Sequence, residues 1–483
     1  MSYYFVSRDK VRRYLDVVPG TDLRALDVVD RKGALADGTP FFLGPDMRPR
    51  EPLCSYAFEM QKTLGAGSLE DYTYDLLAVE DYLAALDPPV DLLSATEDDL
   101  VGYRDYRTEH QDNPVQPGTW KRNRAAINSF YGWAVDTHLL DRMPYLKRKN
   151  GRDALQWDVV VEMPVRHLTY PQWHHLHRVG FGGYLPDGRM DRSFRGQDVL
   201  RNMSAAELAV TSGARQREFR ALLDIEVGEP RLDRTPAKVK LQAIAKRGRP
   251  RDLWIQHEVL RSVDLYRRIE RAATITKAAP TLYRNRANLF VVTDVDRRAM
   301  KLTGRLHGRT RTFAIAAMKE PLRRITVIEG DRGLEPMALF IGRGGRMLGK
   351  SRWQQIFDAA SSRAETIKGP VVMPPKVTAH DCRHTFAVYM LQILTEQLVQ
   401  EYVESAKRAG DAATPTYVFK HISRNPLLTV QRLLGHSSPS TTMKYLYYLE
   451  DTNVLVQRAL AEWTSADKTY ADYATWLSDE AVA

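Results

Sequence analysis

Tyr445 lies at the end of a segment whose residue types suit chemistry at a phosphate group. His436 stands nine residues earlier, across a turn at which Gly435 is predicted to end a helix. This spacing lets both side chains face one pocket, where the tyrosine hydroxyl is a candidate nucleophile. The alternative is a half-buried core tyrosine, because Tyr447 and Tyr448 show that tyrosine is common here, and these two are the next candidates for a nucleophile.

Two further segments carry basic residues at predicted turns. In SGARQRE, Arg215 follows a glycine turn and Glu218 stands three residues later, close enough to orient a guanidinium. In KRGRPR, Lys246 begins a tight turn between two predicted strands and could act as a movable proton donor. Taken singly, the first segment is equally a surface salt bridge and the second a solvated hairpin tip.

The segment HDCRHT places His380 and Arg383 three residues apart, on one face of a predicted helix start. Each could then donate a hydrogen bond to an oxygen of the same phosphate. A zinc site is the alternative, since His380, Cys382 and His384 are all possible ligands. However, their spacing matches no zinc motif and Arg383 between them would repel a cation, so we expect no metal.

Together and in this order, the four segments resemble the motifs of the tyrosine recombinase, or phage integrase, family. SGARQRE resembles the family's T-G-x-R-x-x-E, with Ser212 in the threonine place, and KRGRPR resembles K-x-G-K-P-R. HDCRHTFA resembles H-x-L-R-H-T-F-A, and LLGHSSPSTTMKY resembles L-L-G-H-S-x-x-S-T-T-x-x-Y. Upstream, the stretch from Gly118 to Ala134 resembles the last helix of the family's core-binding domain, so the resemblance spans about residues 61–450.

The resemblance implies a site-specific DNA recombinase, of the integrase or transposon type, that cleaves and rejoins strands through a 3′-phosphotyrosine intermediate. Tyr445 would be the nucleophile, Lys246 would protonate the departing 5′ oxygen, and Glu218 would hold the arginine geometry. The residues that would contact the phosphate are Arg215, Arg383, His380 and His436. No cofactor is implied: nothing requires ATP, magnesium or zinc. The alternatives are a type IB topoisomerase, a telomere resolvase or a catalytically silent DNA-binding relative.

The composition agrees with a nucleic-acid partner. The chain has 483 residues, a formal net charge of +10 and a pI of about 9.3, which favours polyanions. No apolar run is long enough for a membrane span and no signal peptide is evident, while two cysteines cannot form a disulfide framework. We therefore expect an intracellular protein, and the family resemblance implies a cytoplasmic, nucleoid-associated protein of a bacterium or mobile element. The basic residues proposed to contact DNA are Lys121, Arg122, Arg124, Arg247, Arg249 and Arg251.

The pattern along the chain predicts several domains. Residues 1–60 are rich in proline and glycine and form a lead-in or arm segment; 61–146 form an all-α, SAM-like core-binding domain; and 159–450 form an α+β, mainly helical catalytic domain with a small antiparallel sheet. Within the second segment, Thr96 and Thr119 are predicted helix N-caps. The acidic tail, 451–483, would dock on a neighbouring protomer or pack on its own catalytic domain.

The resemblance also implies binding partners, and the chain departs from the family pattern in two places. Double-stranded DNA at specific sites, a homotetramer on two synapsed sites, and accessory bending or directionality factors are expected, with no membrane partner. The stretches from Lys246 to His380 and from Arg383 to His436 are longer than the family pattern predicts. The target sequence and the direction of recombination are not legible in the chain.

Overall fold

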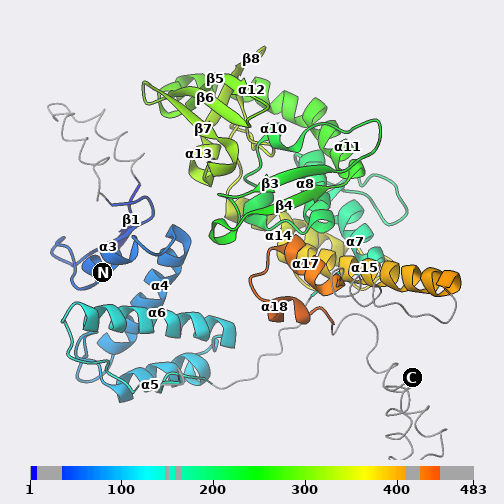
Figure 1. The fold of residues 1–483 in the computed structure, drawn as a ribbon. Helices are drawn as coiled ribbons and strands as arrows, with labels where there is room; N and C mark the ends of the chain where they lie inside the picture. Colours follow the sequence, from blue (N-terminus) through cyan, green and yellow to red (C-terminus); the bar gives the residue numbers. More distant parts are fainter. Residues whose placement is uncertain (1, 8–34, 147–151, 158–165, 410–424, 447–483) are drawn as a thin grey trace, which may run out of the picture. The chain divides into compact units, whose positions relative to one another are not determined.

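The computed structural model describes residues 2–7, 35–146, 152–157, 166–409 and 425–446. The chain divides into two compact units, Met1–Met163 and Pro164–Ala483, which are treated one at a time (Figure 1). Tyr447, Tyr448 and the acidic tail lie outside the described residues, as does the basic run Lys147–Lys149. The predictions for these segments therefore stay predictions.

The N-terminal unit is a small helical domain with a two-stranded antiparallel sheet. Its elements are β1 (Ser2–Phe5), β2 (Pro40–Leu43), α3 (Leu53–Met60), α4 (Ala66–Ala84), α5 (Glu97–Asp105) and α6 (Pro117–Asp136). The apolar face predicted for α6 forms the core, because Trp120, Ile127 and Phe130 are all buried. Leu53 and Tyr56 of α3 belong to the same core, so the end of the predicted lead-in packs with the helical domain.

Local capping signals explain where two of these helices begin. Thr96 caps α5 as predicted: its hydroxyl accepts from the Asp99 amide, and the Asp99 carboxylate accepts from the Thr96 amide at 2.9 Å. The prediction for Thr119 was wrong, since α6 starts at Pro117 and Thr119 lies inside its first turn. Proline has no amide hydrogen to lose at a helix start, which makes Pro117 the better first residue.

The C-terminal unit is built on long helices that surround one apolar core. These helices are α8 (Val199–Ser212), α11 (His257–Tyr266), α14 (Lys350–Thr366) and α15 (Ala379–Ala409). Leu208, Leu260, Trp353 and Cys382, one from each helix, are fully buried in this core. α15 begins before the predicted start at Thr385, so His380 and Arg383 lie within its first turns. Two shorter helices follow, α17 (Pro426–Leu434) and α18 (Ser440–Met443).

Two sheets accompany these helices. The predicted strand pair around the basic turn is confirmed as β3 (Ala237–Leu241) and β4 (Arg251–Ile255), which pair antiparallel. A second sheet was not predicted: it has the strand order β7-β6-β5-β8-β9 and lies in the long stretch between Lys246 and His380. Its strands are β5 (Phe290–Asp296), β6 (Lys301–Leu306), β7 (Arg309–Ala314), β8 (Thr326–Gly330) and β9 (Gly333–Pro336).

The mainly helical fold class with small sheets and a SAM-like domain is confirmed. The five-stranded sheet differs in one respect from the expected antiparallel sheet, because β5 and β8 run parallel. One face of this sheet packs on helix α12 (Ala272–Arg284) through Ala278 and Leu282, and the other holds its own apolar cluster around Leu302. The sheet is therefore a rigid addition to the helical core.

Candidate active site

The first motif forms a sharp corner that presents Arg215. Helix α8 ends at Ser212, and Gly213 follows in the left-handed conformation with φ of 62°. A side chain at Gly213 would collide with the ring of Phe386, so only glycine fits this turn. Arg215 is then the N-cap of the short helix α9 (Gln216–Phe219), and its amide donates to the Glu218 carboxylate at 2.8 Å.

Glu218 is a fully buried carboxylate held between two guanidiniums. Arg251 Nη2 lies 2.5 Å from Glu218 Oε2, and Arg215 Nη1 lies 3.0 Å from Glu218 Oε1. Burial opposes the charge on Glu218, but the two arginines, Arg251 most strongly, outweigh that cost and lower the pKa of the carboxyl group. Glu218 is therefore ionised and orients both arginines, which agrees with the orienting role predicted for it.

The end of helix α17 gathers three arginines from distant parts of the chain. Three successive carbonyl oxygens at this helix end each accept a hydrogen bond from a different guanidinium. The pairs, carbonyl first, are Leu433 with Arg251, Leu434 with Arg383, and Gly435 with Arg215. The last carbonyls of a helix have no partner within the helix and carry partial negative charge, which explains why cations collect there.

Arg383 is the most deeply placed of these arginines. Only 1% of the residue is exposed, and its second terminal nitrogen donates to the Gly213 carbonyl, which joins the first and third motifs. Burial, together with the charges of Arg215 and Arg251, lowers the pKa of Arg383 to about 9. The guanidinium remains cationic at neutral pH, within a cluster of like charges that lacks a matching number of anions.

The fourth motif places His436 and Tyr445 in one site, as predicted. Gly435 takes the left-handed conformation that ends α17, and the two rings then stack with centroids 6.3 Å apart. His436 Nδ1 lies 2.9 Å from the hydroxyl of Thr442, which fixes the ring orientation. Burial and the neighbouring arginines, Arg383 first, lower the pKa of His436 to about 3, so this imidazole is neutral.

The hydroxyl of Tyr445 contacts a histidine that the sequence reasoning assigned no role beyond a possible zinc ligand. His384 Nδ1 lies 2.9 Å from Tyr445 Oη, and both side chains are buried. Burial raises the pKa of Tyr445 to about 12 against the opposing effect of Arg383, and burial with the charge of His380 lowers that of His384 to about 3. The phenol is therefore protonated and the imidazole neutral, and one hydrogen bond joins them. The four-residue step from His380 to His384 on a helix was the signal that could have identified it.

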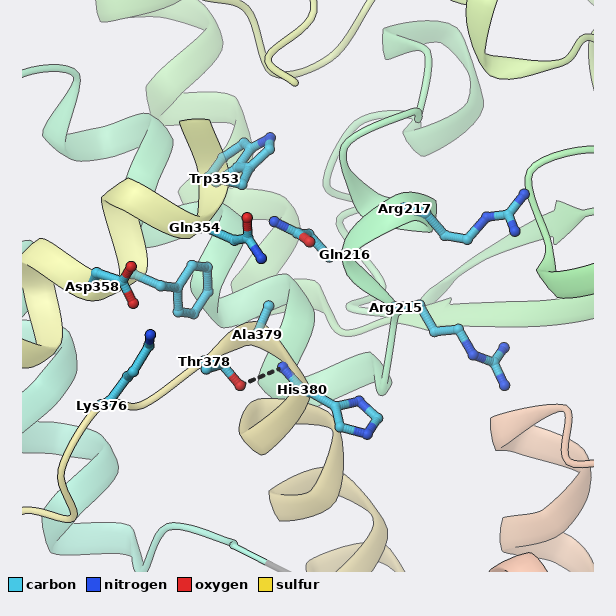
Figure 2. Close-up of a pocket in the computed structure, with 11 residues that line it drawn as sticks. Arg215, Gln216, Arg217, Trp353, Gln354, Asp358, Lys376, Thr378, Ala379 and His380 are labelled. Carbon is cyan, nitrogen blue, oxygen red and sulfur yellow. Dashed lines mark hydrogen bonds between the residues drawn. The ribbon is translucent and has the colours of Figure 1, made fainter. Parts of the chain in front are cut away.

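His380 lies at the exposed rim of the same site. It packs edge-on against His384, with ring centroids 4.3 Å apart, and its amide donates to the Thr378 hydroxyl. His380 and Arg215 both line a hollow of about 550 Å³. Figure 2 shows their side chains extending from this hollow toward the segment that carries α17 and α18, while Arg217 points away from His380.

Lys246 lies on a turn between two strands. It is exposed on the single helical turn Lys246–Gly248 that joins β3 to β4, and it is not among the residues that line the hollow beside Arg215 and His380. The residues that meet are Arg215, Glu218, Arg383, His436 and Tyr445, with His380 at the rim. The role of proton donor for Lys246 stays a prediction.

The residues proposed to contact DNA divide into two groups. Lys121 and Arg249 are exposed, and Arg122 is half exposed although it pairs with Asp75 at 2.7 Å. Two others hold internal pairs. Arg124 lies against the buried Asp153, and Arg251 is buried beside Glu218; the prediction that these two face DNA is therefore corrected. The side chain of Arg247 lies outside the described residues.

Neither a metal site nor a membrane helix was found in the part of the chain that the structure describes. No group of three or more His, Cys, Asp and Glu side chains there is placed to hold a metal ion. Cys382, one of the considered zinc ligands, is fully buried, and burial raises the pKa of its thiol. Among the same residues, no helix combines the length and apolar character that crossing a bilayer requires.

Comparisons with known proteins identify one domain of the chain. Residues 57–138 match the family model for the phage integrase N-terminal SAM-like domain. No curated protein matches the chain. The similar solved structures include the XerH site-specific recombinase bound to palindromic difH substrate, with 12% identity, a TM-score of 0.45, and coverage of 87% of this chain and 86% of that one. The Tn1549 transposon integrase in complex with transposon right end DNA has 12% identity, a TM-score of 0.45, and coverage of 85% and 98%.

These structural likenesses are weak and carry no argument. The helical N-terminal unit contains the matched SAM-like domain, and the C-terminal unit brings Arg215, Arg383, His436 and Tyr445 of the recombinase-like motifs into one site. Residues 57–138 are therefore a domain of the phage integrase N-terminal SAM-like type.

Proposed function

We propose that this protein is a site-specific DNA recombinase that breaks and rejoins strands through a phosphotyrosine bond to Tyr445. The observation that carries the proposal is that Arg215 and Arg383 meet at the end of α17, where the ring of His436 stacks on the buried Tyr445, although these residues come from three separate motifs. Such a set has the charge and the hydrogen-bond donors that a phosphodiester in a displacement reaction needs.

In the proposed reaction, Tyr445 Oη attacks the phosphorus and forms the P–O bond of a 3′-phosphotyrosine. The P–O5′ bond breaks, the phenol loses its proton, and the departing 5′ oxygen gains a proton from Lys246. Arg215 and Arg383 neutralise the charge on the non-bridging oxygens, and His380 and His436 donate to the same phosphate. A 5′ hydroxyl of another strand then reverses each step and restores a phosphodiester, so no external energy source is consumed.

The contact between His384 and Tyr445 gives the tyrosine a resting position in this scheme. A phenol with a pKa of about 12 does not release its proton to an imidazole with a pKa of about 3. Part of the lowering of the His384 pKa comes from nearby positive charges, including Lys444 and Arg383. An arriving phosphate neutralises such charges, raises the pKa of the histidines, and makes His384 a better acceptor for the phenol proton.

The partner in this proposal is duplex DNA at a specific recombination site. The matched SAM-like domain and the catalytic unit would both bind the duplex. Four protomers would bring two recombination sites together, and accessory DNA-bending or directionality factors would act on that assembly. A cytoplasmic, nucleoid-associated location follows from the same proposal. Lys121 and Arg249 are the exposed basic residues best suited to backbone contacts, because neither forms an ion pair among the described residues.

A nicked duplex from the host element tests the proposal, because the nick lets the cleaved end diffuse away and traps the covalent complex. The wild-type protein should give an adduct that peptide mapping places on Tyr445. Tyr445→Phe should abolish the adduct and leave binding nearly unchanged, whereas the matched change Tyr447→Phe should leave both intact. An adduct that persists in Tyr445→Phe would contradict the proposed nucleophile.

Related assays distinguish a recombinase from the other proteins that share this fold or this chemistry. Relaxation of a supercoiled plasmid that lacks the recombination site would indicate a topoisomerase. Hairpin ends on the product would indicate a telomere resolvase. Binding without any adduct, in a protein whose thermal unfolding is cooperative, would indicate a catalytically silent relative.

A further inference from the structure

The edge of the five-stranded sheet carries a concentrated positive charge. Between Arg297 and Ala314 the sequence contains no Asp or Glu, while its lysines and arginines are Arg297, Arg298, Lys301, Arg305, Arg309 and Arg311. All six side chains are exposed. Most of this segment is the antiparallel pair β6–β7, residues 301–314, which we call the basic hairpin. Figure 1 shows these strands at the end of the C-terminal unit away from α17 and α18.

The pairing register shows how the basic hairpin presents its charges. Arg305 pairs with Thr310, so these two side chains share one face, while Arg309 pairs with Leu306 and Arg311 with Gly304, on the opposite face. Because β7 is the edge strand, no other strand of the sheet pairs with its outer side, so the backbone beside its exposed arginines is open. Positive charge thus surrounds the edge and tip of the hairpin.

The arginines of the basic hairpin have no anionic partner among the residues that the structure describes. In the described parts of the chain, no acidic side chain forms an ion pair with Arg305, Arg309 or Arg311, and none of the three donates a side-chain hydrogen bond. By contrast, Arg286, on the helical turn before β5, pairs with Glu329 of β8 at 2.6 Å. Opposite charges on adjacent strands stabilise a sheet and like charges destabilise it, so the surplus on the basic hairpin does not serve the stability of the sheet.

The basic hairpin is also held rigidly. Arg323 anchors the sheet to the helical core, because its guanidinium is buried and pairs with the buried Glu226 while donating to the Ala221 carbonyl. Leu302 on β6 is fully buried in the apolar cluster beneath the sheet. A charged surface on such a support loses little conformational entropy when a partner binds, which favours use as a contact surface.

We propose that the basic hairpin binds the phosphate backbone of duplex DNA outside the segment gripped at Tyr445. The proposal rests on the proposed function for its choice of partner: a chain that acts on DNA already binds a long polyanion that extends beyond the cleavage site. Arginine side chains surround the hairpin edge, and a DNA groove has phosphates along both walls, so the charges are complementary. Thr310 and Thr312, exposed on the outer strand, add hydroxyl donors to phosphate oxygens.

The test compares the salt dependence of binding to linear plasmid DNA of random sequence. The hairpin variant carries Arg305→Gln, Arg309→Gln and Arg311→Gln. The control variant removes the same charge from Arg189, Arg268 and Arg286, which are exposed and already paired with acids. Each lost phosphate contact lowers the slope of log K against log salt by about 0.9, so the hairpin variant should lose up to about 3 in slope. The control variant should keep the wild-type slope.

Each outcome of this comparison decides the proposal. Equal slopes for the hairpin variant and the wild type would overturn it, as would equal losses in both variants, which would reflect net charge alone. Self-association of the hairpin variant at unchanged DNA affinity would also overturn it, because the charges would then protect the sheet edge from strand pairing. If the wild-type protein forms no adduct on nicked duplex, the proposed function is contradicted. The salt dependence of DNA binding can still be compared between the variants, so the two failures are distinguishable.

Discussion

Removal of Arg251 should destabilise the catalytic unit far more than removal of an exposed arginine in an equally short pair. Arg251 and Glu218 are both buried, their charged atoms lie 2.5 Å apart, and Glu218 is fully enclosed. Breaking a buried pair by removing one partner costs about 3 to 5 kcal/mol, because the remaining charge is stranded. Arg215 still contacts Glu218 at 3.0 Å, so the lower end of this range, about 3 kcal/mol, applies to Arg251→Met.

Thermal unfolding measures this effect directly. The unit spans Pro164–Ala483. With an unfolding entropy of about 2.1 cal/mol/K per residue, about 3 kcal/mol corresponds to a fall in Tm of roughly 4 to 6 °C. Arg286→Met is the matched control, because Arg286 pairs with Glu329 at a similar 2.6 Å but both side chains are largely exposed. An exposed pair contributes about 0 to 1 kcal/mol, so this control should lower Tm by no more than about 2 °C.

The double variant Glu218→Gln, Arg251→Met sharpens the result. If the two residues stabilise each other, their combined cost is clearly smaller than the sum of the single costs. Equal Tm values for Arg251→Met and Arg286→Met would refute the reasoning, since burial would then make no difference. Adduct formation by Arg251→Met should also fall at temperatures where the protein is folded, because Arg251 holds both Glu218 and the end of α17.

Three further predictions concern the same site. His384→Leu should destabilise the folded state by about 1 to 3 kcal/mol in urea unfolding, because the Tyr445 hydroxyl loses its buried partner, whereas His384→Gln should recover most of this loss; equal effects would exclude the hydrogen bond. Gly213→Ala should lower Tm and adduct formation together, since φ of 62° and the Phe386 ring exclude a side chain, and an unchanged Tm would contradict the turn. The pKa values of His384 and Glu218 are lower in the folded than in the unfolded protein, so their contribution to stability is complete above about pH 6.5 and is lost as pH falls through the folded values. In His384→Gln, the urea concentration at the unfolding midpoint should therefore change less with pH between about pH 6.5 and 3. A pH profile equal to that of the wild type would contradict this.

Local signals in the sequence predicted the parts of the fold that depend on neighbouring residues. The Thr96 cap and the β3–β4 pair were found because each depends on a few adjacent positions. The five-stranded sheet was missed, and its central pairing is not local: β5 and β8 lie side by side, with Phe290 paired to Thr326, 36 positions further along the chain. The other three strand pairs are hairpins of neighbouring strands. Short strands of this kind gain their stability from partners that no local pattern reveals.

In the candidate site, too, the sequence predicted some features and not others. Residue types and motif order predicted which side chains would meet, and the structure brings Arg215, Arg383, His436 and Tyr445 together. The sequence did not reveal that Arg251, placed by its basic surroundings among the DNA contacts, turns inward to Glu218. Charge along the chain is the same for an exposed arginine and a buried one, and only the tertiary fold decides which partner each finds.

The hydrogen bonds at the end of α17 affect what fraction of the protein molecules can cleave DNA at any moment. Because its three carbonyls position Arg215, Arg251 and Arg383, the arginine cluster has its working geometry only while this helix is docked. The fraction of protein able to cleave is then the docked fraction, and the apparent affinity for substrate is weakened in proportion to the undocked remainder. A substitution that only loosens α17 from β4 or α15 would therefore resemble the loss of a catalytic group, although every such group remained in place.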